Sequence, residues 1–232
     1  MESNQYSDKE AYYFHQHRNE MIPFIPSHAQ SLLEVGCGSG AFASNLKERR
    51  AIVITGIEPQ QAAYEEASAI LDRVLQLDVD SGIEALKDQR FDCIVFNDVL
   101  EHLVDPWNTL KKISELLLPG GRVVVSIPNA RYMPVFKEFV FNADWQYRED
   151  GVMDRTHLRF FTKKSIKIMF ESTGYEVTEL QGINGIDFPW KYSLLNRLVG
   201  RRLEDTRYKQ YACVARLRGE HPPSSAQQEL LL

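Results

Sequence analysis

The sequence predicts an α/β fold in which a doubly wound, mostly parallel sheet lies between layers of helices. Between residues 31 and 129, short apolar segments alternate with helix-like segments, the pattern of parallel strands joined by crossover helices. Residues 91–98 are apolar almost throughout, as expected for a strand buried on both faces. Gly36, Gly38 and Gly40 directly follow the first of these strands. In such a sheet, ligands bind beyond the carboxyl ends of the strands, where this glycine loop lies.

The first five strands are expected in apolar or β-branched segments, namely residues 31–37, 51–58, 73–80, 91–98 and 122–129. The helices between them are expected at residues 41–50, 59–70, 82–89 and 105–118. Proline is tolerated at the first helical position, and Pro59 and Pro106 stand at two of these starts. The Pro-Gly-Gly run at 119–121 is expected to end the fourth helix sharply.

The pattern changes in the second half of the chain. Residues 130–160 are rich in aromatic and charged residues without a clean period, which indicates an irregular cap. A helix is expected at 162–174, followed by two further strands at 175–183 and 211–218.

An amphipathic helix is expected from residue 8 to about residue 20, before Pro23 and Pro26 break the pattern. The expected organisation is an N-terminal helical cap segment (1–27), one domain (28–218) that carries the cap insertion, and a mobile tail (219–232).

Composition excludes several classes of protein. The 232 residues carry a net charge of −5, which argues against nucleic-acid and anionic-membrane partners because these call for a basic face. No segment approaches the roughly 18 consecutive apolar residues of a membrane span, and the polar N-terminus is unlike a signal peptide. Cys37, Cys93 and Cys213 have no metal-like spacing. A cytoplasmic protein with reduced thiols is therefore expected.

The glycine loop indicates a cofactor that contains adenosine. Gly36, Gly38 and Ala41 fit the dinucleotide pattern G-x-G-x-x-G/A, and Glu58 stands about 20 positions further on, where an acidic residue binds ribose hydroxyls. Glycines at these positions let the backbone approach a ligand closely and permit positive φ. The loop alone does not separate NAD from other adenosine cofactors.

Several further motifs resemble those of a known family. The strings LEVGCGSG, GIEP, LQLDV and LLLPGGRVVVSIPN, in this order, resemble the Rossmann-like S-adenosylmethionine-dependent methyltransferases. The resemblance covers roughly residues 28–218. It implies a three-layer α/β/α fold with a seven-stranded sheet whose last strand is antiparallel, and residues 211–218 would form that strand.

The resemblance also implies cofactor-binding roles. Gly36, Cys37, Gly38 and Gly40 would pass under the methionine and ribose of S-adenosylmethionine, with Cys37 a small packed residue and not a nucleophile. Glu34 would hold this loop or meet the amino group of the cofactor.

Further along the chain, Glu58, followed by Pro59, would accept hydrogen bonds from the ribose hydroxyls. Asp78 would bind the adenine amino group, and Val79 would donate its backbone N–H. Asn97 and Asp98 would face the methionine end. For the acidic residues, the alternative is a helix cap or a solvated turn.

The stretch NDVLEH resembles the corresponding segment of the ubiquinone-biosynthesis O-methyltransferases, in which two acidic residues and a histidine can hold a divalent metal. Asp98, Glu101 and His102 occupy the matching positions, and such a set would lower the pKa of a substrate hydroxyl. The alternative, which we favour, is that Glu101 and His102 support the next helix and the cavity wall. No metal is therefore predicted, and His102 remains a candidate catalytic residue.

The segment DRTHLRFFT (154–162) concentrates hydrogen-bonding groups near the expected site. His157 is a candidate general base, and Arg155 or Arg159 would bind a carboxylate or phosphate of the substrate. The alternative is that these arginines form ion pairs with Asp154 that fix the cap. Tyr13 is a candidate for closing the acceptor pocket, unless it serves only packing.

The leading hypothesis is a methyltransferase that uses S-adenosylmethionine and acts on a small molecule at oxygen, as a monomer or homodimer. The alternatives are an NAD-dependent oxidoreductase on the same loop and a non-catalytic protein that binds the cofactor. Glu34, Asp78 and the seventh strand argue against the oxidoreductase. Methyl transfer needs mainly alignment of the acceptor with the sulfonium and exclusion of water, so the lack of a catalytic triad does not count against it.

Overall fold

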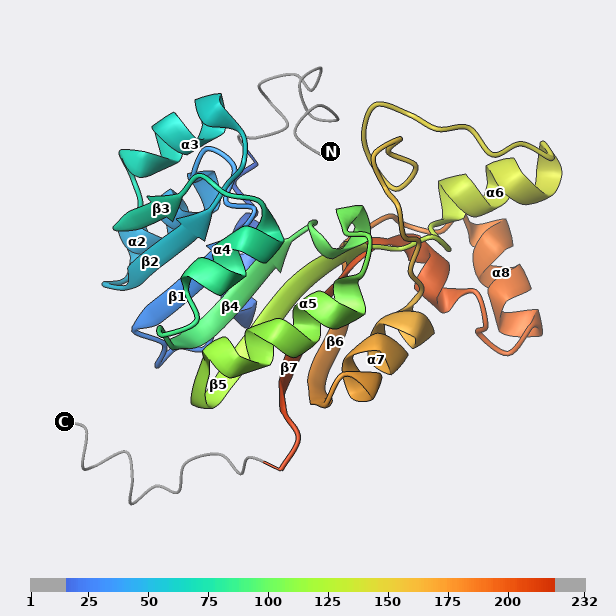
Figure 1. The fold of residues 1–232 in the computed structure, drawn as a ribbon. Coiled ribbons are helices and arrows are strands. Elements are labelled where there is room, and N and C mark those ends of the chain that lie inside the picture. The colour runs from blue at the N-terminus through green and yellow to red at the C-terminus, as the bar shows by residue number, and fades with distance from the viewer. Residues whose placement is uncertain (1–15, 220–232) are drawn as a thin grey trace.

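The computed structural model describes residues 16–219 and contains a seven-stranded sheet with the order β3-β2-β1-β4-β5-β7-β6 (Figure 1). The strands are β1 (Ser31–Val35), β2 (Val53–Ile57), β3 (Arg73–Leu75), β4 (Phe91–Asn97), β5 (Leu117–Pro128), β6 (Tyr175–Gly185) and β7 (Tyr208–Leu217). The first five are parallel, and β7 lies antiparallel between β5 and β6. The predicted mostly parallel sheet with an antiparallel last strand is confirmed.

Helices cover both faces of this sheet. They are η1 (Asn19–Phe24), α2 (Ala41–Arg49), α3 (Gln61–Ser68), α4 (Val79–Ala85), η2 (Leu100–His102), α5 (Pro106–Ile113), η3 (Ser114–Leu116), α6 (Met133–Phe141), α7 (Lys163–Ser172), α8 (Trp190–Leu198) and η4 (Glu204–Arg207). Figure 1 shows α4, α5 and α7 along one face. None of the described helices is long and apolar enough to cross a membrane.

Strand β4 shows how the sheet separates two cores. Its side chains alternate between the faces, so Ile94 and Phe96 pack into the core beneath α5 and α7, whereas Cys93 and Val95 pack into the core beneath α2 and η1. All four are fully buried. The near-continuous apolar character of this segment therefore reflects burial on both faces, as predicted.

Three expected elements have different bounds in the structure. The third strand ends at Leu75, and helix α4 begins at Val79, because Asp78 caps it by accepting a hydrogen bond from the Ser81 N–H at 2.9 Å. The Pro-Gly-Gly run at 119–121 does not stop a helix but lies inside β5, next to a shift in register with β4.

The two expected cap regions also differ. The insertion 130–160 is not wholly irregular, because it contains helix α6. Of the helix expected at 8–20, residues 8–15 lie outside the described residues, and residues 16–18 are not helical. A 3-10 helix, η1, follows and contains Pro23. All but the first residue of the expected tail also lies outside the described residues.

Candidate active site

A cavity of about 980 Å³ opens at the carboxyl ends of β1, β2 and β4. Of the predicted cofactor-binding residues, all but Gly40 line it, namely Glu34, Gly36, Cys37, Gly38, Glu58, Pro59, Asp78, Val79, Asn97 and Asp98. His102 and His157 line it as well. The structure thus brings together residues from five separate segments of the chain at the edge where ligands of doubly wound sheets bind.

The glycine loop requires glycine for two different reasons. Gly36, Gly38 and Gly40 all have positive φ, at 69°, 54° and 82°. A Cβ on Gly36 would lie 2.7 Å from Val99 Cγ2, so a side chain there has no room. A Cβ on Gly40 would lie 2.8 Å from Leu71 Cδ1, which shows that Gly40 serves packing behind the loop. At Gly36 and Gly38 the loop backbone therefore lines the cavity without a side chain of its own.

Glu58 fixes the shape of this loop. Its side chain is 4% exposed; Oε2 accepts a hydrogen bond from the Gly38 N–H at 2.9 Å, and Oε1 accepts one from the Gln60 N–H at 2.9 Å. Burial raises the pKa of Glu58, and these two N–H groups oppose the rise without cancelling it. Each carboxyl oxygen keeps further acceptor capacity for a ligand in the cavity.

Glu34 and Asn97 form a second buried polar pair. Glu34 is 2% exposed, and burial raises its pKa to about 8. The Asn97 amide donates to Glu34 Oε1 at 3.4 Å, while Glu34 Oε2 and Asn97 Oδ1 have no hydrogen-bond partner among the described residues. Buried acceptors without partners are costly, so this pair is suited to a donor or cation that enters the cavity.

Asp78 lies at the far rim of the cavity, as the N-cap of α4. Its two carboxylate oxygens accept from the Ser81 N–H at 2.9 Å and the Ser81 hydroxyl at 3.0 Å, and these hydrogen bonds lower its pKa. The helix-cap alternative considered for this position is therefore observed. The side chain is exposed and still lines the cavity, so the cap leaves it accessible to a ligand.

Asp98 is held by groups from three distant segments. Its carboxylate is ion-paired with Arg18 and accepts hydrogen bonds from the Ser126 hydroxyl at 2.7 Å and from the Gln210 amide. Burial raises the pKa of Asp98, but Arg18 and the hydrogen bonds outweigh it and lower the pKa. Asp98 is therefore an anchored anion in the cavity wall.

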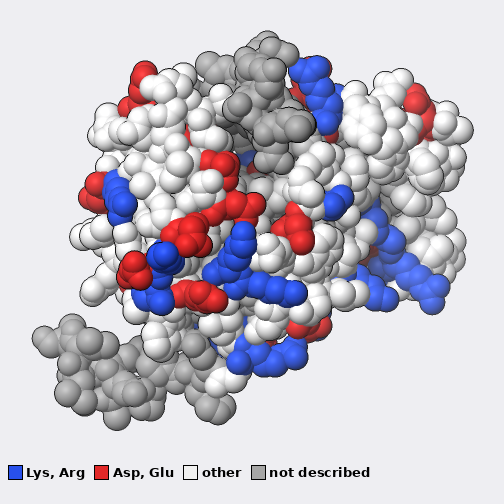
Figure 2. Space-filling view, in the orientation of Figure 1, with Lys and Arg blue, Asp and Glu red and all other residues white. Residues whose placement is uncertain are grey.

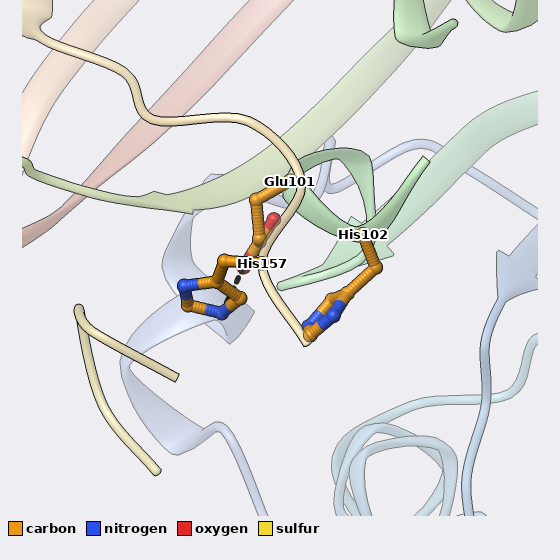
Figure 3. Close-up of side chains that lie close together, drawn as sticks. All are labelled: Glu101, His102 and His157. Atoms are coloured by element: carbon orange, nitrogen blue, oxygen red, sulfur yellow. Dashed lines mark ion pairs between the residues drawn. The ribbon is translucent and has the colours of Figure 1, made fainter. Parts of the chain in front are cut away.

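Glu101, His102 and His157 form a cluster at the same wall (Figure 3). His157 Nε2 lies 3.8 Å from Glu101 Oε1, and the two imidazole rings meet edge to face with centroids 4.7 Å apart. Glu101 and His102 lie on η2, whereas His157 comes from the cap. The Glu101 carbonyl accepts hydrogen bonds from the backbone N–H groups of Leu158 and Arg159 at 2.9 and 3.0 Å, which holds the cap in place.

Hydrogen bonds determine which imidazole nitrogens carry protons. His157 Nδ1 lies 3.0 Å from the Val152 carbonyl, so Nδ1 donates and Nε2 is unprotonated in the neutral ring. His102 Nδ1 lies 3.1 Å from both the carbonyl and the hydroxyl oxygen of Thr156. Because the Thr156 hydroxyl donates to Asp154 Oδ1 at 2.7 Å, both partners of His102 Nδ1 act as acceptors. In both rings, Nε2 is therefore the basic nitrogen.

Two members of this cluster, Glu101 and His102, have strongly shifted pKa values. Burial and the nearby Asp98 raise the pKa of Glu101 well above its ordinary value, and neither Glu101 carboxyl oxygen has a hydrogen-bond partner among the described residues. Burial and the neighbouring His157 lower the pKa of His102 to about 4. His102 is thus neutral near pH 7 and a weak base, so His157 is the better placed of the two histidines for proton transfer.

The sequence offered Asp98, Glu101 and His102 as possible metal ligands, but the structure brings a different set of side chains together. The side-chain atoms that lie within 4.8 Å of one another belong to Glu101, His102 and His157, while Asp98 is engaged by Arg18. Two imidazoles and a carboxylate are a suitable donor set for a divalent transition metal. Any bound metal would therefore use His157 in place of Asp98.

The predicted substrate-binding residues do not lie together at the cavity. Arg155 is ion-paired with Glu149 at 3.0 Å, and the Arg159 guanidinium donates to the Val104 carbonyl. Neither arginine lines the cavity. Tyr13 lies outside the described residues.

Sequence reasoning missed Arg18, Ser126 and Gln210 as residues of the site. The local sequence gives no signal for them, because Arg18 and Gln210 come from segments far away in the chain and Ser126 reaches Asp98 through the pairing of β5 with β4.

Comparison with known proteins identifies the family. A family model described as a methyltransferase domain matches residues 7–180. This chain belongs to that family. The predicted Rossmann-like, S-adenosylmethionine-dependent methyltransferase class is therefore confirmed.

Two curated relatives and one solved structure illustrate the similarity. The ubiquinone biosynthesis O-methyltransferase of Coxiella burnetii is 31% identical over 66% of this chain and 66% of its own length. The human mitochondrial enzyme of the same name is 26% identical over 90% of this chain and 58% of its own length, so the chain spans less than two thirds of either relative. A methyltransferase from Archaeoglobus fulgidus shares the fold, with a TM-score of 0.63, 17% identity and coverage of 89% of this chain and 94% of its own.

Proposed function

We propose that this methyltransferase transfers a methyl group from S-adenosylmethionine to a hydroxyl group of a small-molecule acceptor, and that His157 accepts the hydroxyl proton. The observation that carries the proposal is the buried Glu101–His102–His157 cluster at the wall of the cofactor cavity. An oxygen acceptor is also supported by the relatives, which are named as O-methyltransferases.

In this proposal the cofactor lies along the edge formed by β1, β2 and β4. Glu58 would accept hydrogen bonds from the ribose hydroxyls, since it presents two buried carboxyl oxygens beside the glycine loop. Asp78 would bind the adenine amino group at the rim. Glu34 and Asn97, whose acceptor atoms lack partners, would receive the ammonium group of the methionine part. The binding of a cation there would favour the ionised form of Glu34.

The reaction is an in-line displacement. The acceptor oxygen forms a bond to the methyl carbon while the carbon–sulfur bond breaks, and that electron pair stays on sulfur, which leaves a neutral thioether. The hydroxyl proton passes to His157 Nε2, because Nδ1 already donates to the Val152 carbonyl. The Glu101 carboxyl lies 3.8 Å away, and a positive charge on the imidazole would favour its ionised form, so the charges of the two groups are coupled.

His102 contributes in another way. With a pKa of about 4 it stays neutral during the reaction, and its edge-to-face contact holds the His157 ring in orientation. Such orientation matters because the reacting oxygen must stand opposite the sulfur, and small displacements are costly in rate.

The first test is calorimetric titration with S-adenosylhomocysteine and, separately, NAD, on the wild-type protein and on Glu58→Ala. We expect binding of S-adenosylhomocysteine alone, lost in the variant. Transfer of labelled methyl groups is then measured with a panel of phenols, catechols, aliphatic alcohols and amines. Turnover with amines only, or binding of S-adenosylhomocysteine without any transfer to hydroxyl compounds, would contradict the proposal.

A further inference from the structure

Helix α8 presents its apolar side to the outside of the molecule. Trp190, Leu194 and Leu198 recur every four residues and therefore form one stripe along the helix. They are 72%, 52% and 77% exposed. The opposite side of the helix is turned inward and is polar: Asn196 is buried and bonds to Glu204 at 2.7 Å. A surface helix of a globular protein normally shows the reverse arrangement.

The exposed apolar surface extends beyond α8. Ten of the fourteen large hydrophobic side chains that are exposed among the described residues lie in two segments, α6 with the loop after it and α8 with the residue after it. They are Phe139, Val140, Phe141, Trp145, Tyr147, Trp190, Leu194, Leu195, Leu198 and Val199, which we call the apolar patch. Figure 1 shows α6 and α8 at the same end of the molecule. Such a concentration marks an interaction surface.

Positive charge borders the apolar patch in a protein whose net charge is −5. From residue 188 to residue 202 the chain carries four cations and no acidic residue, namely Lys191, Arg197, Arg201 and Arg202. Figure 2 shows Lys and Arg gathered over α8, at the right of the view, below a mostly uncharged surface with an acidic group at its upper edge. Lys191 Nζ also lies 5.6 Å from the centre of the Trp190 ring, so cationic and aromatic groups are interleaved.

The basic surface continues from α8 to the start of α7. Arg131 donates to the Arg202 carbonyl at 2.8 Å and lines a shallow pocket together with Lys163, Lys164 and Lys167. Acidic groups near it are already paired, as Asp205 is with Arg131 at 2.8 Å. The surface therefore combines an apolar centre with a cationic border.

We propose that the apolar patch and its cationic border form a docking surface for a bilayer that contains anionic phospholipids. Tryptophan, phenylalanine and leucine on one side of a helix, with lysine and arginine beside them, suit the boundary between headgroups and acyl chains. The cations are attracted to anionic headgroups. A second copy of the chain fits less well, because two such faces would bring their cationic borders together.

This inference departs from the expectation, drawn from net charge, of no membrane partner. Net charge describes the whole chain and does not show where cations gather, and the segment 188–202 carries four of them without an acidic residue. The proposal concerns binding to a surface and does not depend on the acceptor or on methyl transfer.

The test is co-sedimentation of the protein with vesicles of phosphatidylcholine and phosphatidylglycerol in equal parts, compared with vesicles of phosphatidylcholine alone. We expect clear binding to the anionic vesicles, weakened by raising the salt concentration to about 1 M, where charges are screened within about 3 Å. The apolar stripe is tested with Trp190→Gln/Leu194→Gln/Leu198→Gln, and the cations with Lys191→Glu/Arg197→Glu. These positions are exposed, and Ile168→Gln on α7, 52% exposed and outside the apolar patch, is the matched control.

Each cation near an anionic surface contributes about fivefold to binding, so the charge-reversal variant should bind at least about 25-fold more weakly. The glutamine variant should lose binding, while Ile168→Gln binds like the wild type. Circular dichroism and S-adenosylhomocysteine binding check that each variant is folded. The proposal is overturned if the wild type does not bind anionic vesicles or if both patch variants bind like the control. A dimer that the glutamine variant abolishes, without vesicle binding, would assign the face to a second copy instead.

Discussion

Arg18 and Asp98, eighty positions apart in the chain, form an ion pair in the cavity wall, and both have left-handed backbone conformations with φ of 47° and 54°. Neither residue is a glycine, so the surrounding contacts must hold these conformations in place. Asp98 is fixed by Ser126 and Gln210, whereas Arg18 belongs to the segment that enters η1. The pair therefore connects the N-terminal segment to the end of β4.

Arg18→Met should destabilise the protein more than the loss of a surface ion pair would. It leaves the buried Asp98 carboxylate without its counter-charge, which costs about 3–5 kcal/mol of unfolding free energy for a buried pair. The measurement is urea unfolding at pH 7. In the double variant Arg18→Met/Asp98→Asn, much of the loss should be recovered, since no uncompensated charge remains. Additive losses from the two single substitutions would show that the residues are not coupled.

Gly36→Ala should abolish binding of S-adenosylhomocysteine, because the new methyl group would lie 2.7 Å from Val99 Cγ2 and force the loop to move. Gly174→Ala is the matched control: Gly174 also has positive φ, at 96°, but nothing lies within 4 Å of its Cβ position. Gly174→Ala should lower the unfolding free energy by about 1–2 kcal/mol, because alanine disfavours a left-handed backbone conformation. Binding of S-adenosylhomocysteine should be unchanged. Calorimetry and thermal unfolding separate the two effects. Equal effects on binding would refute a special role of the Gly36 loop.

Binding of S-adenosylhomocysteine should release a proton from Glu34. With a pKa of about 8, Glu34 is mostly protonated at pH 7 in the free protein, and the ammonium group of the ligand would lower that pKa. Affinity should therefore rise with pH below about 8 and level off above it. Calorimetry in buffers with different ionisation enthalpies counts the released proton directly. Glu34→Gln should release none, and unchanged release in this variant would place the proton elsewhere.

The unfolding free energy of the free protein should also depend on pH because of Glu34, and it should fall as pH rises. Because the folded-state pKa of Glu34 lies above the ordinary 4.5, the folded state binds more protons than the unfolded state between about pH 4.5 and pH 8. Glu34 thus lowers the unfolding free energy as pH rises, by at most about 1.4 kcal/mol per pH unit in this window. Comparison of Glu34→Gln with the wild type by urea unfolding at several pH values isolates this contribution.

The parts of the site that the sequence predicts are those encoded locally. Gly36 and Glu58 follow strand segments that are recognisable from their apolar runs, and parallel pairing of β1 with β2 brings the two strand ends together. The cap role of Asp78 also has a local signal, since Ser81 stands three positions later as in a helix start.

The remaining parts depend on long-range packing. Arg18 reaches Asp98 only because the N-terminal segment folds back over the sheet, and Gln210 does so because β7 lies beside β5. The exposure of the apolar stripe of α8 could not be predicted from the sequence either, because periodicity shows that a helix is amphipathic but not which side faces the protein. The buried side of that helix is set by Asn196, whose partner Glu204 belongs to another element.

His157→Gln should lower the rate of methyl transfer about 100-fold or more while leaving S-adenosylhomocysteine binding unchanged, since it removes the proton acceptor and not a cofactor contact. Glu101→Gln should have a smaller effect on rate and should displace the pH profile, because the Glu101 carboxyl lies 3.8 Å from His157 Nε2 and its ionisation is coupled to the charge on the imidazole. The measurement is single-turnover transfer over a range of pH. A pH profile identical to that of the wild type in Glu101→Gln would remove Glu101 from the mechanism.

Removal of divalent metals should leave methyl transfer intact. In the structure the Asp98 carboxylate is committed to Arg18, and the basic nitrogen of His157 faces Glu101, so the cluster can transfer a proton without an ion. Dialysis against a chelator, followed by the transfer assay with and without added magnesium or zinc, checks this. If activity disappears on dialysis and one of the ions restores it, Glu101, His102 and His157 are metal ligands. The proton would then leave a metal-bound hydroxyl whose pKa the ion has lowered.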